Sequence, residues 1–158
     1  MTAASVRQVL LVNSFDDRDM YAEYLRGAGF AVRAVDDPDA ALALVPMITC
    51  DVVITDMVFA RGTISGPALI RELRARLDRS TSIIVVSGRV RQEDREEARR
   101  AGADLFLIKP ALPSEVLFEV RRALARRREG RRIEWNWREL PARASALPRG
   151  RRGRRRAS

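Results

Sequence analysis

The amino-acid sequence predicts an α/β fold in which five parallel strands form one doubly wound sheet. Three observations predict it: five short apolar runs, helical patterns between the runs, and turn residues that separate the two. The runs are mostly continuous rather than alternating, which is typical of parallel strands covered on both faces. Parallel neighbours need crossover connections, and the intervening helices supply them.

Each of the five apolar runs has the length of a strand. In chain order they are VLLV at 9–12, FAVRAV at 30–35, DVVITD at 51–56, SIIVV at 82–86 and LFLI at 105–108. The strict alternation of these runs with helical patterns indicates one α/β sheet with helices on both faces.

The stretches between the runs place apolar residues on one face of a helix. The clearest sets are Met20, Tyr21, Tyr24, Leu25 and Ala28; Leu69, Ile70, Leu73 and Leu77; and Val116, Leu117, Val120 and Leu124. Glycines expected to end helices are Gly27, Gly29 and Gly102. Asp37 and Pro38 predict the N-cap and the first residue of the second helix. The stretch 91–102 offers only alanines to the core, so its helix should have low local stability.

The basic residues are concentrated at one end of the chain. Residues 1–125 contain 17 basic and 18 acidic residues, whereas residues 126–158 contain 13 arginines and 3 glutamates. The net charge of +9 therefore comes from residues 126–158. The charge of residues 1–125 gives no reason to regard them as a nucleic-acid-binding domain. We predict a domain over 1–125 and an Arg-rich tail over 126–158, which extends the last helix to Gly130 and then becomes disordered.

Several classes of protein are excluded or disfavoured by composition. No apolar run approaches the ~20 residues of a membrane-spanning helix, and the first residues lack a signal-peptide core. The single cysteine, Cys50, suits a reducing compartment, so we expect a cytoplasmic protein without membrane insertion. The absence of histidine excludes a histidine base, a histidine metal ligand and a phosphohistidine in this chain.

Polar and charged residues follow the strands at the ends where functional groups of parallel sheets collect. Asn13 and Ser14 follow the first run, Asp56 ends the third, Ser87 follows the fourth and Lys109 follows the fifth. A carboxylate can attack a phosphoryl donor and hold an acyl phosphate if charge on the transferring oxygens is neutralised. Lys109, the only lysine among 30 basic residues, would supply one compact positive charge.

With these residues in place, residues 7–125 resemble the receiver domain of bacterial two-component response regulators. The resemblance is carried by DVVITD, IIVVSG and ADLFLIKP, and it implies a flavodoxin-like receiver fold. It implies that Asp56 is the phosphoacceptor, that Ser87 is the switch hydroxyl and that Lys109 contacts the phosphoryl group. It further implies that Phe106 turns inward on activation and that a cis peptide precedes Pro110.

The first strand departs from the receiver pattern. Receivers carry an acidic pair there that binds Mg²⁺ together with the phosphoacceptor, whereas this chain has Asn13 and Ser14. The resemblance adds Asp56 and the backbone of Val58 as metal ligands, so we expect weak Mg²⁺ binding. Either Asp16 or Asp17 could bring a carboxylate to the pocket, or the two could serve as N-cap and first-turn acid of the helix.

Two functions follow, and the sequence leaves both open. One is a stand-alone receiver that accepts a phosphoryl group from a sensor histidine kinase or phosphotransfer protein and signals to an output protein by contact. The other is a phosphorylation-independent pseudo-receiver. Neither is an enzyme, and a homodimer is compatible with both.

The tail adds a further alternative. Clustered arginines attract phosphates, and Trp135 and Trp137 could stack on bases, so nucleic acid or another polyanion is a candidate partner. The alternation of Ile133, Trp135 and Trp137 is equally compatible with a segment that docks on the domain itself.

Overall fold

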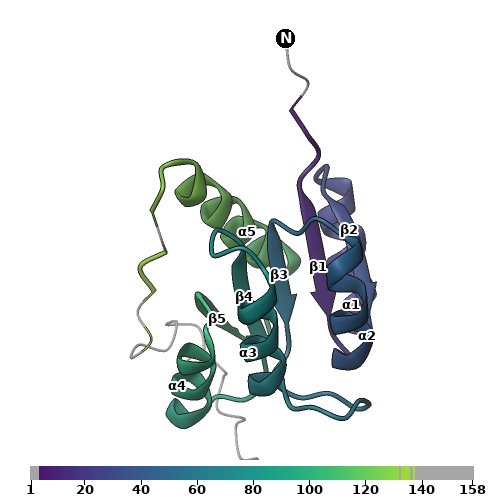
Figure 1. The fold of residues 1–158 in the computed structure, drawn as a ribbon, viewed down its shortest axis with the longest axis vertical. Coiled ribbons are helices and arrows are strands. Elements are labelled where there is room, and N and C mark those ends of the chain that lie inside the picture. Colours follow the sequence, from purple (N-terminus) through teal and green to yellow (C-terminus); the bar gives the residue numbers. More distant parts are fainter. Residues whose placement is uncertain (1–3, 132, 136, 138–158) are drawn as a thin grey trace, which may run out of the picture.

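The computed structural model describes residues 4–131, 133–135 and 137, and it contains one five-stranded parallel sheet (Figure 1). The strands lie in the order β2-β1-β3-β4-β5, so β2 and β5 form the two edges. The strands are β1 (Gln8–Val12), β2 (Ala31–Val35), β3 (Val52–Thr55), β4 (Ser82–Ser87) and β5 (Leu105–Ile108). All five coincide with the predicted apolar runs.

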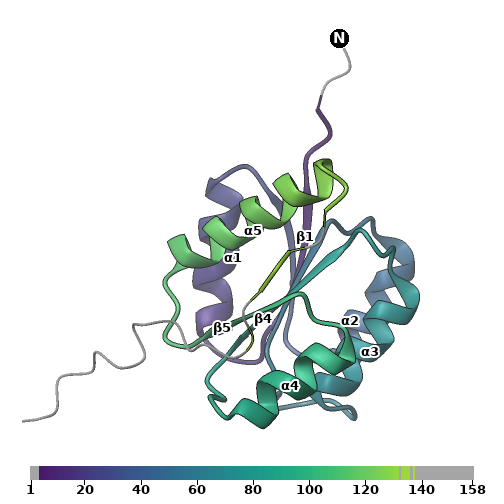
Figure 2. The same cartoon turned by 90° about the vertical axis from the view of Figure 1, so that its left-hand side faces the viewer.

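Helices cover both faces of the sheet, which confirms the doubly wound α/β fold. The helices are α1 (Asp17–Gly27), α2 (Pro38–Leu44), α3 (Gly66–Arg76), α4 (Gln92–Ala101) and α5 (Pro113–Arg128), with a 3-10 turn at Val45–Met47. Figure 2 shows α1 and α5 on one face and α2, α3 and α4 on the other. Among the described residues, no helix is both long enough and apolar enough to cross a membrane.

Side chains of the central strands alternate between two core clusters. Leu11 and Ile54 point toward α1 and α5, whereas Leu10 and Val53 point toward α2, α3 and α4. All four are at most 1% exposed, because both faces of the sheet are covered. Because both faces of each central strand are buried, the strands appear in the sequence as continuous apolar runs.

The predicted helix boundaries are present. The Asp37 side chain accepts a hydrogen bond from the Ala40 amide at 2.7 Å and caps α2. Gly102 ends α4 with a positive φ of 117°, a conformation that costs glycine little. Helix α5 runs to Arg128, as the predicted extension of the last helix toward Gly130 requires. The disorder predicted for the tail beyond residue 137 lies outside the described residues.

A carboxylate joins three segments at the amino-terminal edge of the sheet. Asp51, which precedes β3, accepts hydrogen bonds from the Gln8 amide at 2.8 Å and from Arg127 at 2.7 Å. Arg7 approaches the same carboxylate at 3.4 Å. The start of β1, the start of β3 and the last turn of α5 are therefore tied together on the side of the domain away from the carboxyl ends of the strands.

We expect Cys50 to be unreactive in the folded protein. Its side chain is buried, its Sγ donates to the Val52 carbonyl at 3.2 Å, and burial raises the pKa of the thiol to about 11. The thiolate is the reactive species, so Ellman's reagent should label Cys50 only as fast as the protein unfolds. Labelling in urea serves as the control, and rapid labelling of the native protein would show that this burial is wrong.

Candidate functional site

The residues predicted at the strand ends meet at the carboxyl-terminal edge of the sheet. Asp56 directly follows β3 and Lys109 directly follows β5, and Lys109 Nζ lies 2.8 Å from Asp56 Oδ2. Asn13 follows β1 and Ser87 ends β4, and both are buried beside these strand ends. Parallel topology brings the four together although the sequence spreads them over almost 100 positions.

Asp56 is a buried carboxylate whose two oxygens have different partners. It is 3% exposed, and Oδ1 accepts hydrogen bonds from the Met57 amide at 2.6 Å and the Val58 amide at 3.3 Å. Oδ2 accepts a hydrogen bond from Lys109. The backbone of the loop after β3 therefore fixes one oxygen, and a side-chain cation holds the other.

Lys109 bridges two carboxylates. Its ammonium lies 2.8 Å from Asp56 Oδ2 and 2.9 Å from Asp17 Oδ2, and it stands 5.3 Å from the centre of the Phe15 ring. Burial alone would lower the pKa of Lys109, but hydrogen bonds and charges from Asp56 and Asp17 outweigh it, so the pKa is raised. The ammonium stays protonated over the whole neutral range.

Asp17 reaches the pocket, and Asn13 orients it. The Asn13 amide donates from Nδ2 to Asp17 Oδ1 at 2.8 Å, while Asn13 Oδ1 accepts from the Phe15 amide at 2.8 Å. An aspartate at position 13 has no such donor. Asp16, the other candidate acid, occupies the N-cap position of α1, is exposed and makes no capping hydrogen bond with its side chain.

The remaining predicted residues lie close by with other contacts. The Ser14 hydroxyl donates to the Asp36 carbonyl, which directs it toward the end of β2. Ser87 is fully buried, and its Oγ accepts from the Arg89 amide at 3.3 Å. Phe106, expected to turn inward on activation, already lies inward at 1% exposure. The predicted cis peptide between Lys109 and Pro110 is confirmed.

Two aromatic residues beside the pocket were missed by the sequence reasoning. Phe15 stands over Lys109, and the Tyr21 hydroxyl donates to the Ala111 carbonyl at 2.7 Å. Burial, then the charge of Asp17, raises the pKa of Tyr21. Tyr21 had been assigned only to the apolar face of α1, and no spacing in the sequence indicates its contact with the loop after β5.

The donor set is compatible with a magnesium ion held by few protein ligands. Mg²⁺ is bound by oxygen, commonly through one or two carboxylates with waters and phosphate oxygens completing an octahedron. Asp56 and Asp17 supply two carboxylates on either side of one ammonium. No group of three or more acidic, cysteine or histidine ligands gathers anywhere in the described part of the chain. The residues thus fit Mg²⁺, since two carboxylates lie within the number that it commonly uses.

Proteins of known sequence resemble this chain over its predicted domain. Transcriptional regulatory protein PrrA of Mycobacterium leprae is 32% identical over 129 residues, covering 80% of this chain and 53% of PrrA. Regulatory protein VirG of Agrobacterium tumefaciens is 35% identical over 123 residues, covering 75% of this chain and 44% of VirG. The chain thus spans about half the length of these relatives.

Solved structures show the same fold. A CheY-like receiver domain protein of Methanospirillum hungatei has a TM-score of 0.73 at 20% identity, covering 80% of this chain and 99% of its own. Chemotaxis response regulator CheY4 of Vibrio cholerae has a TM-score of 0.68 at 25% identity, covering 75% and 99% respectively.

Receiver domains are signalling modules of two-component systems rather than classical enzymes. In this family an aspartate accepts the phosphoryl group, Mg²⁺ binds at an acidic pocket, and histidine kinases or phosphotransfer proteins and output domains are the partners. Residues 9–121 match the response regulator receiver domain, so the chain belongs to this family.

Proposed function

We propose that this chain accepts a phosphoryl group on Asp56 in a two-component phosphorelay and passes the signal on by protein–protein contact. The observation that supports it most is the contact of Lys109 with Asp56, which joins a nucleophile to a cation at the strand ends. The donor is a sensor histidine kinase or a phosphotransfer protein.

Asp56 Oδ2 is the oxygen that attacks phosphorus. Oδ1 is held by two backbone amides, whereas the partner of Oδ2 is a side chain that can move. In the transfer, a bond forms between Oδ2 and phosphorus while the bond between phosphorus and the donor's imidazole nitrogen breaks. The departing imidazole takes up a proton from solvent, and the product is an acyl phosphate on Asp56.

Lys109 neutralises the charge that the transfer brings into the pocket. Its ammonium has three donors, so it can contact a phosphoryl oxygen after leaving Oδ2 while it keeps its contact with Asp17. The Ser87 hydroxyl can turn from the Arg89 amide to donate to a second phosphoryl oxygen. Asp17 and Asn13 thereby act as positioning residues, because they hold Lys109 in place.

Mg²⁺ would be held by Asp56, Asp17 and the backbone of Val58. When bound, the ion neutralises charge on the phosphoryl oxygens. Asn13 and Ser14 contribute no carboxylate, and the Lys109 ammonium already pairs with both acids that remain, so Mg²⁺ affinity should be weaker than with an acidic pair. Asp17 supplies the carboxylate that the acidic pair would otherwise provide, and Asp16 is not a ligand.

We expect acetyl phosphate with Mg²⁺ to add the mass of one phosphoryl group, and Asp56→Asn to abolish the addition. Asp17→Asn should raise the Mg²⁺ concentration needed for half-maximal phosphorylation by about tenfold, the effect of losing ~1.4 kcal/mol of ion binding. Intact-mass spectrometry over a Mg²⁺ series measures both. Asp16→Asn is the matched control, because the exposed Asp16 contacts nothing in the pocket.

A phosphorylation-independent pseudo-receiver is the second candidate, and one observation favours it. Lys109 already holds the Asp56 and Asp17 carboxylates together in ion pairs, so the cluster is assembled without a metal or a phosphoryl group. The same mass measurement separates the two functions. If no mass is added at high Mg²⁺ and high acetyl phosphate, the chain is a pseudo-receiver. If Asp16→Asn and Asp17→Asn respond equally to Mg²⁺, Asp17 is not a metal ligand.

A further inference from the structure

Both loops that carry the proposed Mg²⁺ ligands contact the short connection between β2 and α2. We call residues 36–39, which enter α2, the brace. On one side, the Ser14 hydroxyl donates to the Asp36 carbonyl, which ties the loop between β1 and α1 to the brace. On the other side, the Asp39 carboxylate accepts hydrogen bonds from the loop between β3 and α3. One segment outside the pocket therefore touches both halves of the site.

Asp39 uses both of its carboxylate oxygens to hold Thr63. Oδ2 accepts a hydrogen bond from the Thr63 amide and Oδ1 accepts one from the Thr63 hydroxyl, each at 2.7 Å. Hydrogen bonds to an ionised acceptor are roughly twice as strong as those between neutral groups. The loop after β3 is therefore fixed to the first turn of α2, although Asp39 and Thr63 are both exposed.

The backbone beside Thr63 lies directly against the brace. Gly62 has a positive φ of 103°, and a Cβ at this position would lie 2.6 Å from Pro38 Cδ. Glycine alone combines this backbone conformation with so close an approach. The contact between the loop and the brace is thus built into the backbone as well as into the Asp39 side chain.

The same loop holds the phosphoacceptor at its other end. The Met57 and Val58 amides donate to Asp56 Oδ1 at 2.6 and 3.3 Å. Between this end and Thr63, the side chains of Val58, Phe59 and Ile64 are half-buried and pack against the core cluster on the α2, α3 and α4 face. A loop that loses its hold on Asp39 therefore gains freedom next to Val58, because the packed residues join the two ends.

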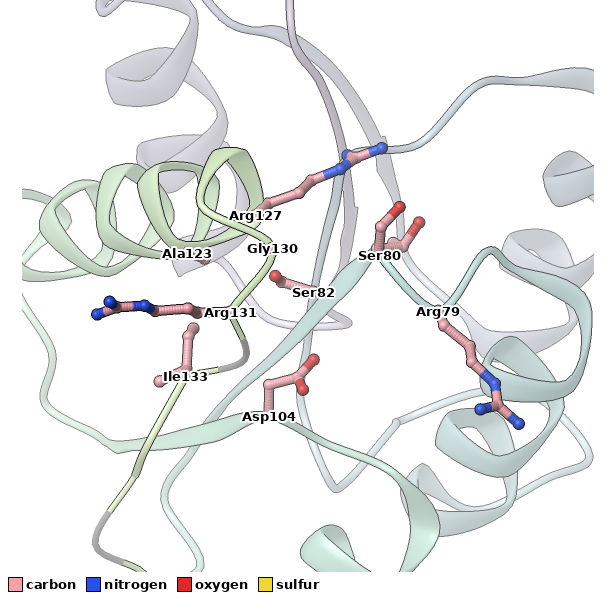
Figure 3. Close-up of a pocket in the computed structure, with 10 residues that line it drawn as sticks. Arg79, Ser80, Ser82, Asp104, Ala123, Arg127, Gly130, Arg131 and Ile133 are labelled. Carbon is pink, nitrogen blue, oxygen red and sulfur yellow. The ribbon is translucent and has the colours of Figure 1, made fainter.

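The opposite edge of the sheet holds a cavity, but its cations do not face it. The cavity, of about 280 Å³, lies beside Ser82 at the start of β4 (Figure 3). Figure 3 shows the guanidinium groups of Arg79 and Arg131 pointing away from it, and Arg127 is held by Asp51. The three arginines of the lining thus offer no charge to an anion, and we place ligand binding at the carboxyl-terminal edge only.

We propose that Asp39 is a positioning residue for Mg²⁺, which acts through Thr63 to hold the loop after β3 where the Val58 backbone and Asp56 can bind the ion. The inference rests on the Mg²⁺ site of the proposed function. With Asp56 and Asp17 as its only carboxylates, the site gains much of its affinity from ligands that are held in place before the ion arrives. Asp39 itself is not a ligand.

The test is a Mg²⁺ titration of the full chain, followed at the Val58 amide by NMR without any phosphodonor. Asp39→Ala should raise the Mg²⁺ concentration for the half-maximal shift by about tenfold, the low end for losing a partner that orients a metal ligand. Asp78→Ala is the matched control and should change nothing. Asp78 is also exposed and also accepts a hydrogen bond from a loop amide, that of Ser80 at 2.7 Å, but it lies at the opposite edge.

Variants of Thr63 separate the hydrogen bonds from the charge of Asp39. Thr63→Val changes no charge and removes only the hydroxyl bond, so it should raise the half-maximal Mg²⁺ concentration by roughly threefold. Thr63→Ser keeps both bonds and should bind Mg²⁺ as the wild type does. If Thr63→Val binds as tightly as Thr63→Ser, the effect of Asp39 is only electrostatic and the proposal is wrong.

Amide hydrogen exchange without Mg²⁺ distinguishes positioning from local support. In Asp39→Ala, exchange should become faster at Met57 and Val58 as well as at Thr63, whereas residues 52–55 in β3 should exchange as in the wild type. Faster exchange at Thr63 alone would show that the loop does not connect Asp39 with the pocket, and the proposal would fail.

Tryptophan emission guards against a misfolded variant. Trp135 packs against the core cluster on the α1 and α5 face and Trp137 against the cluster on the opposite face, so disruption of either layer alters the emission. Asp39→Ala should keep the emission of the wild type. If it does not, the pair of Thr63 variants still decides the question, because Thr63 is exposed and both replacements are of similar size.

The outcomes also separate this inference from phosphoryl transfer. If Mg²⁺ shifts the Val58 amide and Asp39→Ala weakens the response, Asp39 positions the ion whether or not acetyl phosphate modifies Asp56. A wild type that binds Mg²⁺ but gains no mass would count against the proposed function alone. A Val58 amide that does not respond to Mg²⁺ in the wild type, or an unchanged response in Asp39→Ala, would overturn the inference.

Discussion

Replacing Lys109 with methionine should lower the free energy of unfolding by about 3 kcal/mol at neutral pH, as expected when one partner is removed from a buried ion pair. The variant leaves the carboxylates of Asp56 and Asp17 facing each other without a cation, and Asp56 has a side chain only 4% exposed. Urea unfolding followed by circular dichroism measures the loss. Methionine keeps the length and apolar stem of the lysine, so lost packing contributes little.

A double-mutant cycle identifies charge as the cause. Asp56→Asn in the Lys109→Met background removes one of the two opposed carboxylates, so the double variant should be more stable than Lys109→Met alone. The coupling energy should fall within ~1–3 kcal/mol, as for residues in direct contact. Additive effects of the two substitutions would mean that the pair is not coupled and that the geometry of the pocket differs from the one described.

The difference between wild type and Lys109→Met should also depend on pH. The folded state raises the pKa of Lys109, so its contribution is fully present below the ordinary value of 10.5 and is lost as pH rises through the folded value. The free energies of unfolding of the wild type and of Lys109→Met, plotted against pH, should therefore converge above pH 10.5. Ionisation of Tyr21, whose pKa burial raises, destabilises both proteins at high pH, but to different extents, because the charge of Lys109 lowers that pKa in the wild type only.

Gly66→Ala should destabilise the fold by ~1–3 kcal/mol, the usual cost of forcing extra volume into a packed site. A Cβ at Gly66 would lie 2.7 Å from the carbonyl carbon of Met57 and nearer still to its oxygen. Backbone cannot yield as a flexible side chain does, so the first turn of α3 must move. The Met57 amide holds Asp56 Oδ1, and the pocket should shift with it.

Gly88→Ala is the matched control for this substitution. Gly88 also lies at the carboxyl-terminal edge, but a Cβ there would have nothing within 4 Å. Thermal unfolding of the two variants should therefore separate them clearly. Equal losses would show that the close approach of Gly66 to Met57 is absent in solution.

The fold could be predicted because its signals are local or periodic. Five mostly continuous apolar runs marked the strands, Asp37 marked a helix start through its capping side chain, and Gly102 marked a helix end through its left-handed backbone. Parallel strands need crossover helices, so the alternation of elements left few arrangements. The contact between Asp56 and Lys109 could be predicted from this topology, because both residues follow parallel strands, although they lie far apart in the sequence.

The details of the site could not be predicted, because they depend on side-chain directions. The sequence placed Asp17 in the first turn of a helix, but only the hydrogen bond from Asn13 turns its carboxylate toward Lys109. Similarly, the alternation of Ile133, Trp135 and Trp137 left open whether the segment docks on the domain. An alternating pattern indicates which side chains lie on the same face of a segment. It does not identify the surface against which they pack.

The junction at Asp51 determines where local opening can begin at the end of the domain. Arg127 binds this carboxylate one residue before α5 ends, whereas Gly130 follows with a backbone that favours a turn. The free energy of opening should therefore change abruptly between these two residues, high on the helical side and low beyond it. The segment that contains Ile133 and Trp135 should therefore detach and return on a timescale of its own, while α5 stays wound and the sheet stays intact.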